Sequence, residues 1–62
     1  MKERSFMNAK EVAKELGISQ SKAYAVIRQL NGELKAKGYL TLSGRVSRAY
    51  FNEKWYGGVN GG

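Results

Sequence analysis

The side chains of this 62-residue chain that could do chemistry are cations, hydroxyls and amides. Histidine and cysteine are both absent, which excludes disulfides, zinc fingers, and thiol or imidazole catalysis. Only five carboxylates are present, and no nucleophile elbow, phosphate-binding loop or metal-ligand cluster accompanies them. We therefore expect no enzymatic activity, no cofactor and no metal site.

Positive charge is concentrated in the second part of the chain, and the whole chain carries a net charge of +6. Residues 1–18 hold four cations and three acids, whereas residues 19–62 hold seven cations and two acids. So basic a small domain favours a polyanionic partner, with nucleic acid ahead of a membrane surface. No apolar run approaches the roughly 18 residues of a membrane span, and no signal-peptide pattern is present, so we expect a cytoplasmic protein without membrane contact.

Seven side chains are candidates for contacting nucleic acid. A glutamine can pair with adenine through two hydrogen bonds, an arginine can contact guanine or phosphate, and lysine is suited to phosphate. A tyrosine can reach a phosphate or a thymine methyl group, or it can pack on the protein itself. Capping and plain solvation remain the alternative roles for the others. The candidates are Gln20, Ser21, Lys22, Tyr24, Arg28, Arg45 and Arg48.

The first element expected to position them is a short helix capped by Asn8. Glu11 stands three residues later and completes a capping box, while Met7 and Val12 occupy the positions of a hydrophobic staple. Apolar residues at i, i+3, i+4 and i+7 form one helical face, and Gly17 follows where a positive φ is needed. That face comprises Ala9, Val12, Ala13 and Leu16.

Ser19 is the next N-cap candidate, and the helix after it is expected to run to Lys37 and stop at Gly38. Asn31-Gly32 is a common turn dipeptide, but the apolar periodicity across it favours a continuous helix. The glycine costs such a helix about 1 kcal/mol. The predicted buried stripe is Ala23, Val26, Ile27, Leu30 and Leu34, and the predicted exposed face is Gln20, Ser21, Tyr24, Ala25, Arg28 and Gln29.

Residues 39–42 alternate and are rich in strand formers, Ser43-Gly44 is a turn, and Arg45-Val46 can return as a second strand. This predicts a β-hairpin with a basic tip, from which Arg45 and Arg48 project into solvent. Ser47 then caps a last helix that Gly57 ends. Three aromatic residues are expected in the core, namely Tyr39, Phe51 and Trp55.

Residues 1–62 are expected to form one domain, with a flexible arm at about 1–6 and a flexible tail at about 58–62. Residues 10–27 have the features of a helix-turn-helix: Ala13 is small where a second helix crosses the first, and Gly17 permits the tight turn between them. The fold class predicted is mainly α with a small β-hairpin, a winged helix-turn-helix. The apolar residues that lock its two helices are Val12, Leu16, Ile18, Ala23 and Val26.

On these residues the sequence resembles the helix-turn-helix family that includes excisionases of phages and conjugative elements and the DNA-binding domains of MerR-type regulators. The matching segments are residues 9–19, the helix through Leu30, and residues 44–51. The stretch from Leu30 to Gly38 is longer than in compact members of the family.

The resemblance implies sequence-specific binding of double-stranded DNA by a bacterial or phage-encoded, nucleoid-associated accessory factor. Such a factor binds beside an attachment site, bends the DNA and biases an integrase or recombinase toward excision, as a monomer or a cooperative assembly. A small transcriptional regulator of a phage or mobile element is an alternative. A protein-interaction module that docks through Tyr24, Tyr39 and Tyr56 is another, and RNA binding is a further one.

Overall fold

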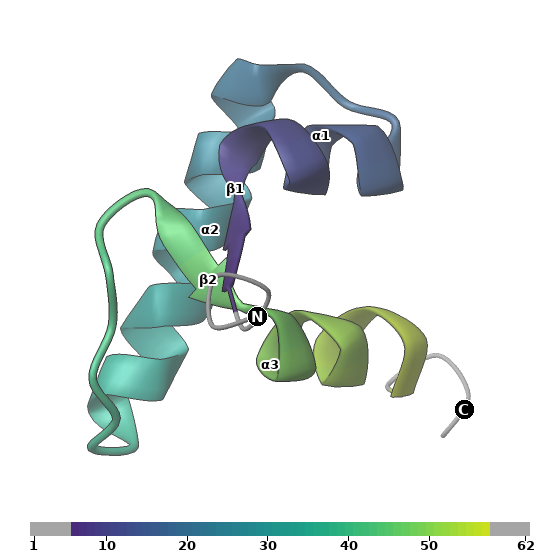
Figure 1. Cartoon of the computed structure of the whole chain (residues 1–62). Coiled ribbons are helices and arrows are strands. Elements are labelled where there is room, and N and C mark those ends of the chain that lie inside the picture. The colour runs from purple at the N-terminus through teal and green to yellow at the C-terminus, as the bar shows by residue number, and fades with distance from the viewer. Residues whose placement is uncertain (1–5, 58–62) are drawn as a thin grey trace.

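A computed structural model of the chain describes residues 6–57; residues 1–5 of the predicted arm and the predicted tail at 58–62 lie outside the described residues. The fold is mainly helical with a small antiparallel two-stranded sheet, in keeping with a winged helix-turn-helix. Figure 1 shows α2 as the long helix, with α1 lying near one of its ends and α3 near the other. The elements are β1 (Phe6–Asn8), α1 (Ala9–Leu16), α2 (Gln20–Ala36), β2 (Arg45–Ser47), α3 (Arg48–Asn52) and a π-helical turn, η2 (Glu53–Gly57).

Helix α1 begins and ends as its sequence predicts. The Asn8 side chain accepts a hydrogen bond from the Glu11 N–H at 2.8 Å, and Glu11 Oε1 accepts one from the Asn8 N–H at 3.1 Å, which completes the capping box. Gly17 has φ of 70°, and the N–H of Ile18 donates to the Ala13 carbonyl at 3.0 Å. This left-handed residue ends the helix and turns the chain into α2 within three residues.

Helix α2 is continuous through Asn31-Gly32, which confirms the prediction from periodicity. The Ser19 hydroxyl caps its first turn by accepting from the Lys22 N–H at 3.2 Å. At the other end the N–H of Gly38 and the N–H of Tyr39 donate to carbonyls of the last turn at 2.9 and 3.0 Å. No helix within residues 6–57 has both the length and the apolar character needed to cross a membrane.

One buried cluster joins all of the elements from β1 to α3. The predicted stripe of α2 lies in it apart from Val26, which is half-buried and packs at its edge. Phe51, Ile27, Val12 and Val46 are its largest fully buried side chains. The full cluster is Met7, Ala9, Val12, Ala13, Ala23, Ile27, Leu30, Leu34, Val46, Tyr50 and Phe51.

The pairing of the sheet differs from the predicted hairpin. Strand β2 pairs with β1, whose first residue lies in the expected arm, and Met7 stands opposite Val46 in the register. Residues 39–41 form no strand, and Leu42 makes only an isolated bridge with Arg45 across the Ser43-Gly44 turn. Pairing with β1 brings two apolar side chains of the cluster together, with Met7 and Val46 exposed by only 3% and 0%.

Two aromatic residues expected in the core are exposed instead. Tyr39 is 61% exposed because it follows the end of α2 in a loop, not in a strand. Trp55 is 43% exposed and lies in the π-helical turn that follows α3. The buried cluster has Phe51 as its last member, so it does not reach the turn that carries Trp55. Phe51 alone of the three is buried, at 2% exposure.

Two alanine substitutions at glycines should change stability in opposite directions. Gly17→Ala should lower the free energy of unfolding by about 1–2 kcal/mol, because a Cβ is strained at its φ of 70°. Gly32→Ala should raise it by roughly 0.5–1 kcal/mol, since Gly32 lies inside α2 and nothing stands within 4 Å of the added Cβ. Urea unfolding of the two variants measures both effects; a shared sign would contradict this account.

Candidate nucleic-acid interface

The exposed face of α2 carries five of the predicted contact residues. Gln20, Ser21 and Lys22 lie in its first turn and are exposed, and Tyr24 and Arg28 follow along the helix. Among residues 6–57, none forms a hydrogen bond or ion pair with the side chains of these five. Their donors and acceptors are therefore available to an external ligand.

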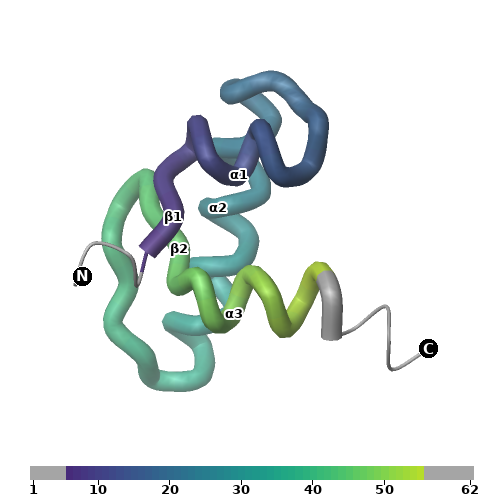
Figure 2. The backbone as a smooth tube through the Cα atoms, turned by 45° about the vertical axis from the view of Figure 1, so that its right-hand side comes forward, coloured from purple at the N-terminus to yellow at the C-terminus, as the bar shows by residue number. Residues whose placement is uncertain are grey.

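A groove runs between α2 and the segment that follows it. This segment, residues 39–44, is called the wing loop below; Figures 1 and 2 show it returning along α2 toward β2. The groove has a volume of about 790 Å³. Its cations are Arg28 and Lys35, and no carboxylate lines it. Its lining comprises Tyr24, Ile27, Arg28, Asn31, Gly32, Lys35, Tyr39, Leu40, Thr41, Ser43 and Gly44.

The side chain of Asn31 ties the wing loop to α2. Its amide Nδ2 donates to the Leu42 carbonyl at 3.0 Å and to the Arg45 carbonyl at 2.7 Å, so the two bonds bracket the turn at residues 43–44. Sequence reasoning treated Asn31 only as a weak point of the helix and missed this role. The sequence does contain a signal for this role. An asparagine amide has two N–H donors, and in a helix that continues through Asn31-Gly32 these donors need acceptors outside the helix.

Tyr24 lies beside the turn of the wing loop. Gly44 has φ of 76°, and Tyr24 Cε1 stands 3.7 Å from the position that a Cβ on Gly44 would take. The tyrosine is nevertheless 50% exposed. Of its two predicted roles, packing on the wing is therefore present, and half of its surface remains accessible to a ligand.

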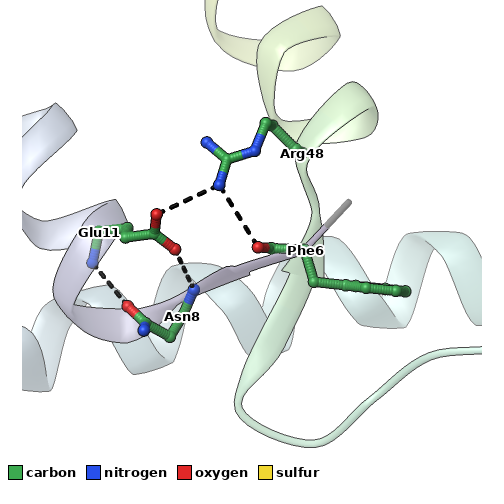
Figure 3. Close-up of polar contacts among 4 residues, drawn as sticks. All are labelled: Phe6, Asn8, Glu11 and Arg48. Carbon is green, nitrogen blue, oxygen red and sulfur yellow. Dashed lines mark hydrogen bonds and ion pairs between the residues drawn. The ribbon is translucent and has the colours of Figure 1, made fainter. Parts of the chain in front are cut away.

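The two arginines of the predicted tip have different surroundings. Arg45, at the start of β2, is exposed as expected. The expectation that Arg48 projects freely into solvent is wrong: its Nη2 donates to Glu11 Oε2 at 3.2 Å and to the Phe6 carbonyl at 3.5 Å. Figure 3 shows the guanidinium group pointing at Glu11 and β1. The cause is the pairing of β1 with β2, which brings the N-terminal capping box next to the first residue of α3.

The carboxylate of Glu11 accepts hydrogen bonds from two of these groups, and they change its pKa. Hydrogen bonding from the Asn8 N–H, followed by hydrogen bonding from Arg48, lowers the pKa of Glu11 below its ordinary value of 4.5. Both side chains remain partly exposed, at 38% for Arg48 and 46% for Glu11, so solvent screens the pair. The pair therefore connects β1, α1 and α3 with a modest contribution to stability.

A second polar cluster joins α3 and η2 to α2 on the side of Tyr50. The Tyr50 hydroxyl donates to Glu33 Oε1 at 2.6 Å, and Lys54 Nζ stands 3.6 Å from the same oxygen. The bond to Glu33 raises the pKa of Tyr50 to about 12. Lys37 Nζ stands 5.1 Å from the centre of the Tyr50 ring. These cations serve contacts within the protein.

Comparison with known proteins identifies one informative relative. The chain is similar to the ICEBs1 excisionase of Bacillus subtilis (strain 168), with 46% identity over 48 residues. The matched region is 77% of this chain and 75% of the relative. No protein-family model and no solved structure matches the chain.

Replacing Glu11 by glutamine should test the ion pair without removing the cap, because glutamine also completes a capping box. We expect Glu11→Gln to lower the free energy of unfolding by about 0.5 kcal/mol at pH 7. A lowered carboxylate pKa stabilises the folded state above pH 4.5, and this contribution is lost as the pH falls through the folded-state pKa. Thermal unfolding should therefore show a larger difference between variant and wild type at pH 7 than at pH 3. An equal difference at both values would assign it to the cap.

Asn31→Asp should destabilise the wing loop. The substitution keeps the size of the side chain, removes both N–H donors and turns a carboxylate toward two carbonyl oxygens. We expect a loss of about 2 kcal/mol from two hydrogen bonds and faster hydrogen exchange at the Arg45 N–H, which bonds to the Leu42 carbonyl. Asn52→Asp, at an exposed position of α3, makes the same chemical change and should shift stability by less than about 0.5 kcal/mol. Equal losses in both variants would show that Asn31 does not hold the loop.

Proposed function

Because the chain belongs to the excisionase family of small DNA-binding proteins of mobile elements, we propose that it binds duplex DNA as an accessory factor in the excision of such an element. The observation that supports this most directly is the exposed face of α2. It presents hydrogen-bonding and cationic side chains that make no bonds to the described part of the chain. The protein breaks no covalent bond in this scheme; strand exchange is left to a recombinase, its protein partner.

Helix α2 is the recognition helix of the proposed complex, with its first turns in the major groove. Gln20 and Ser21 contact base edges there, since N-terminal residues of a recognition helix reach the bases. Lys22 neutralises a phosphate. Arg28, two turns after Gln20 and Ser21 on the same face, donates to guanine or to the backbone. Tyr24 supports the wing and presents its exposed half to the DNA.

The wing contributes cationic contacts to the flanking backbone or minor groove. Arg45 is the arginine that we assign to this role, because it is exposed at the end of the wing loop. Arg48 was predicted to share the role. Its bonds to Glu11 and the Phe6 carbonyl favour a place in the fold instead, and we leave it out of the proposed DNA contacts.

The work of such a protein is architectural. When two elements of one small domain bind adjacent grooves, the duplex is favoured in a bent form. A bend of this kind brings distant recombinase sites closer together. We place this activity beside an attachment site on DNA in the bacterial cytoplasm. Binding of several copies in tandem would enlarge the small interface that one domain offers.

Substitution of two arginines should separate base recognition from backbone contact. On a duplex selected by the protein from a random library, Arg28→Ala should weaken binding by about 1–3 kcal/mol, and by less on a random duplex. Arg45→Ala should weaken binding to both duplexes alike and reduce the slope of log K against log salt by about 1. Fluorescence anisotropy over a series of salt concentrations measures both.

Lys54→Ala is the matched control, because Lys54 lies on the side of α3 and η2 and pairs with Glu33. Its affinity and salt slope should equal those of the wild type. Equal losses in all three variants would indicate unspecific attraction by the net charge. Absence of duplex binding by the wild type at low salt would refute the proposed function.

A further inference from the structure

The wing loop displays apolar side chains that the fold does not use. Leu40 is 96% exposed, and its neighbours Tyr39 and Leu42 are 61% and 46% exposed. Isolated exposed apolar residues are ordinary, but here three large ones occur within four positions of one loop. Burial in the core therefore does not explain why this loop is apolar.

The loop is nevertheless held in place. The Tyr39 N–H donates to the Leu34 carbonyl at 3.0 Å at its start, and Asn31 holds the Leu42 carbonyl at 3.0 Å near its end. Leu40 lies between these two anchors. A side chain displayed on an anchored backbone loses less conformational entropy on binding than one on a loop that must first become ordered.

The charge around Leu40 indicates the class of partner. No acidic residue occurs between Glu33 and Glu53, whereas Lys35 and Lys37 precede the loop and Arg45 follows it. In a two-fold symmetric contact a second copy of this chain would bring the same cations against each other, and like charges facing each other across an interface are unfavourable. A polyanion whose surface also contains apolar groups is complementary. The minor groove of duplex DNA, with sugar walls between two rows of phosphates, has this character.

We propose that Leu40 enters the minor groove of the bound duplex as an apolar wedge, next to the major groove that α2 occupies. This inference rests on the proposed DNA binding. Lys35 before the loop and Arg45 after it contact the two phosphate backbones, and the leucine packs against sugars and base edges between them. Apolar side chains inserted in this way partly unstack a base step and bend the duplex toward the major groove. Leu40 would then be the residue through which binding produces a bend.

Leu40→Ser tests the wedge without threatening the fold, because the side chain is 96% exposed. The melting temperature should stay that of the wild type. Affinity for the selected duplex should fall about tenfold, as expected when a partly buried leucine contact is lost. The salt slope should not change, because no phosphate contact is lost; Arg45→Ala should reduce it. Leu40→Met keeps an apolar side chain and should retain wild-type affinity.

Two spectroscopic readouts locate the contact. Duplexes with 2-aminopurine at successive steps should show a fluorescence rise at one step with the wild type and none with Leu40→Ser. Energy transfer between dyes on the duplex ends should show a smaller bend with the serine variant. Wild-type affinity and bend in Leu40→Ser would overturn the wedge while leaving the proposed function intact. Unchanged DNA binding with lost self-association or lost recombinase binding would assign Leu40 to a protein partner and also overturn it. Failure of the wild type to bind any duplex would refute the proposed function itself.

Discussion

The buried stripe of α2 is the constraint on which the rest of the domain depends. Ala23, Ile27, Leu30 and Leu34 belong to the one cluster that also contains apolar residues of β1, α1, β2 and α3. A chain of this length has a single small core, so each element is stable only while it contacts that stripe. A break of α2 at Asn31-Gly32 would remove Leu34 from the cluster and release the support of the wing loop. The continuity of this one helix therefore sets both the core and the shape of the candidate interface.

Polar contacts fix the placement of elements that so small a core does not determine by itself. Arg48 joins α3 to the capping box of α1, and Glu33 receives the Tyr50 hydroxyl and lies near Lys54. Asn31 fixes the wing loop from the other side of α2. These contacts are mostly exposed and individually weak, but each joins segments that are far apart in the sequence. Their combined effect is to fix the placement of short elements whose apolar area alone is small.

Local rules predicted those features that depend on residues close in sequence. The caps at Asn8 and Ser19, the left-handed Gly17 and the buried stripe of α2 all follow from spacings of three or four residues. The pairing of β1 with β2 does not follow from such spacings, because it joins Met7 to Val46 across most of the chain. That pairing also decides the surroundings of Arg48, so one unforeseen long-range contact changed the expected exposure of a candidate residue. Trp55 was misplaced for a different reason: the i, i+4 spacing puts it on the face of Phe51 but does not say how far the core extends, and the buried cluster ends at Phe51.

The fold also divides the excess positive charge between two sides of α2. Arg48, Lys54 and Lys37 contact Glu11, Glu33 and the Tyr50 ring, on the side formed by β1, α3 and η2. Arg28 and Lys35 line the groove of the wing loop, where no carboxylate competes for them. Composition alone counts these cations as equivalent, but only those beside the wing loop can attract a polyanion without first giving up a partner within the protein. Glu11 and Glu33 thus do more than reduce the net charge: by pairing with cations on one side, they leave the side of the wing loop, where we propose DNA contact, as the more positive one.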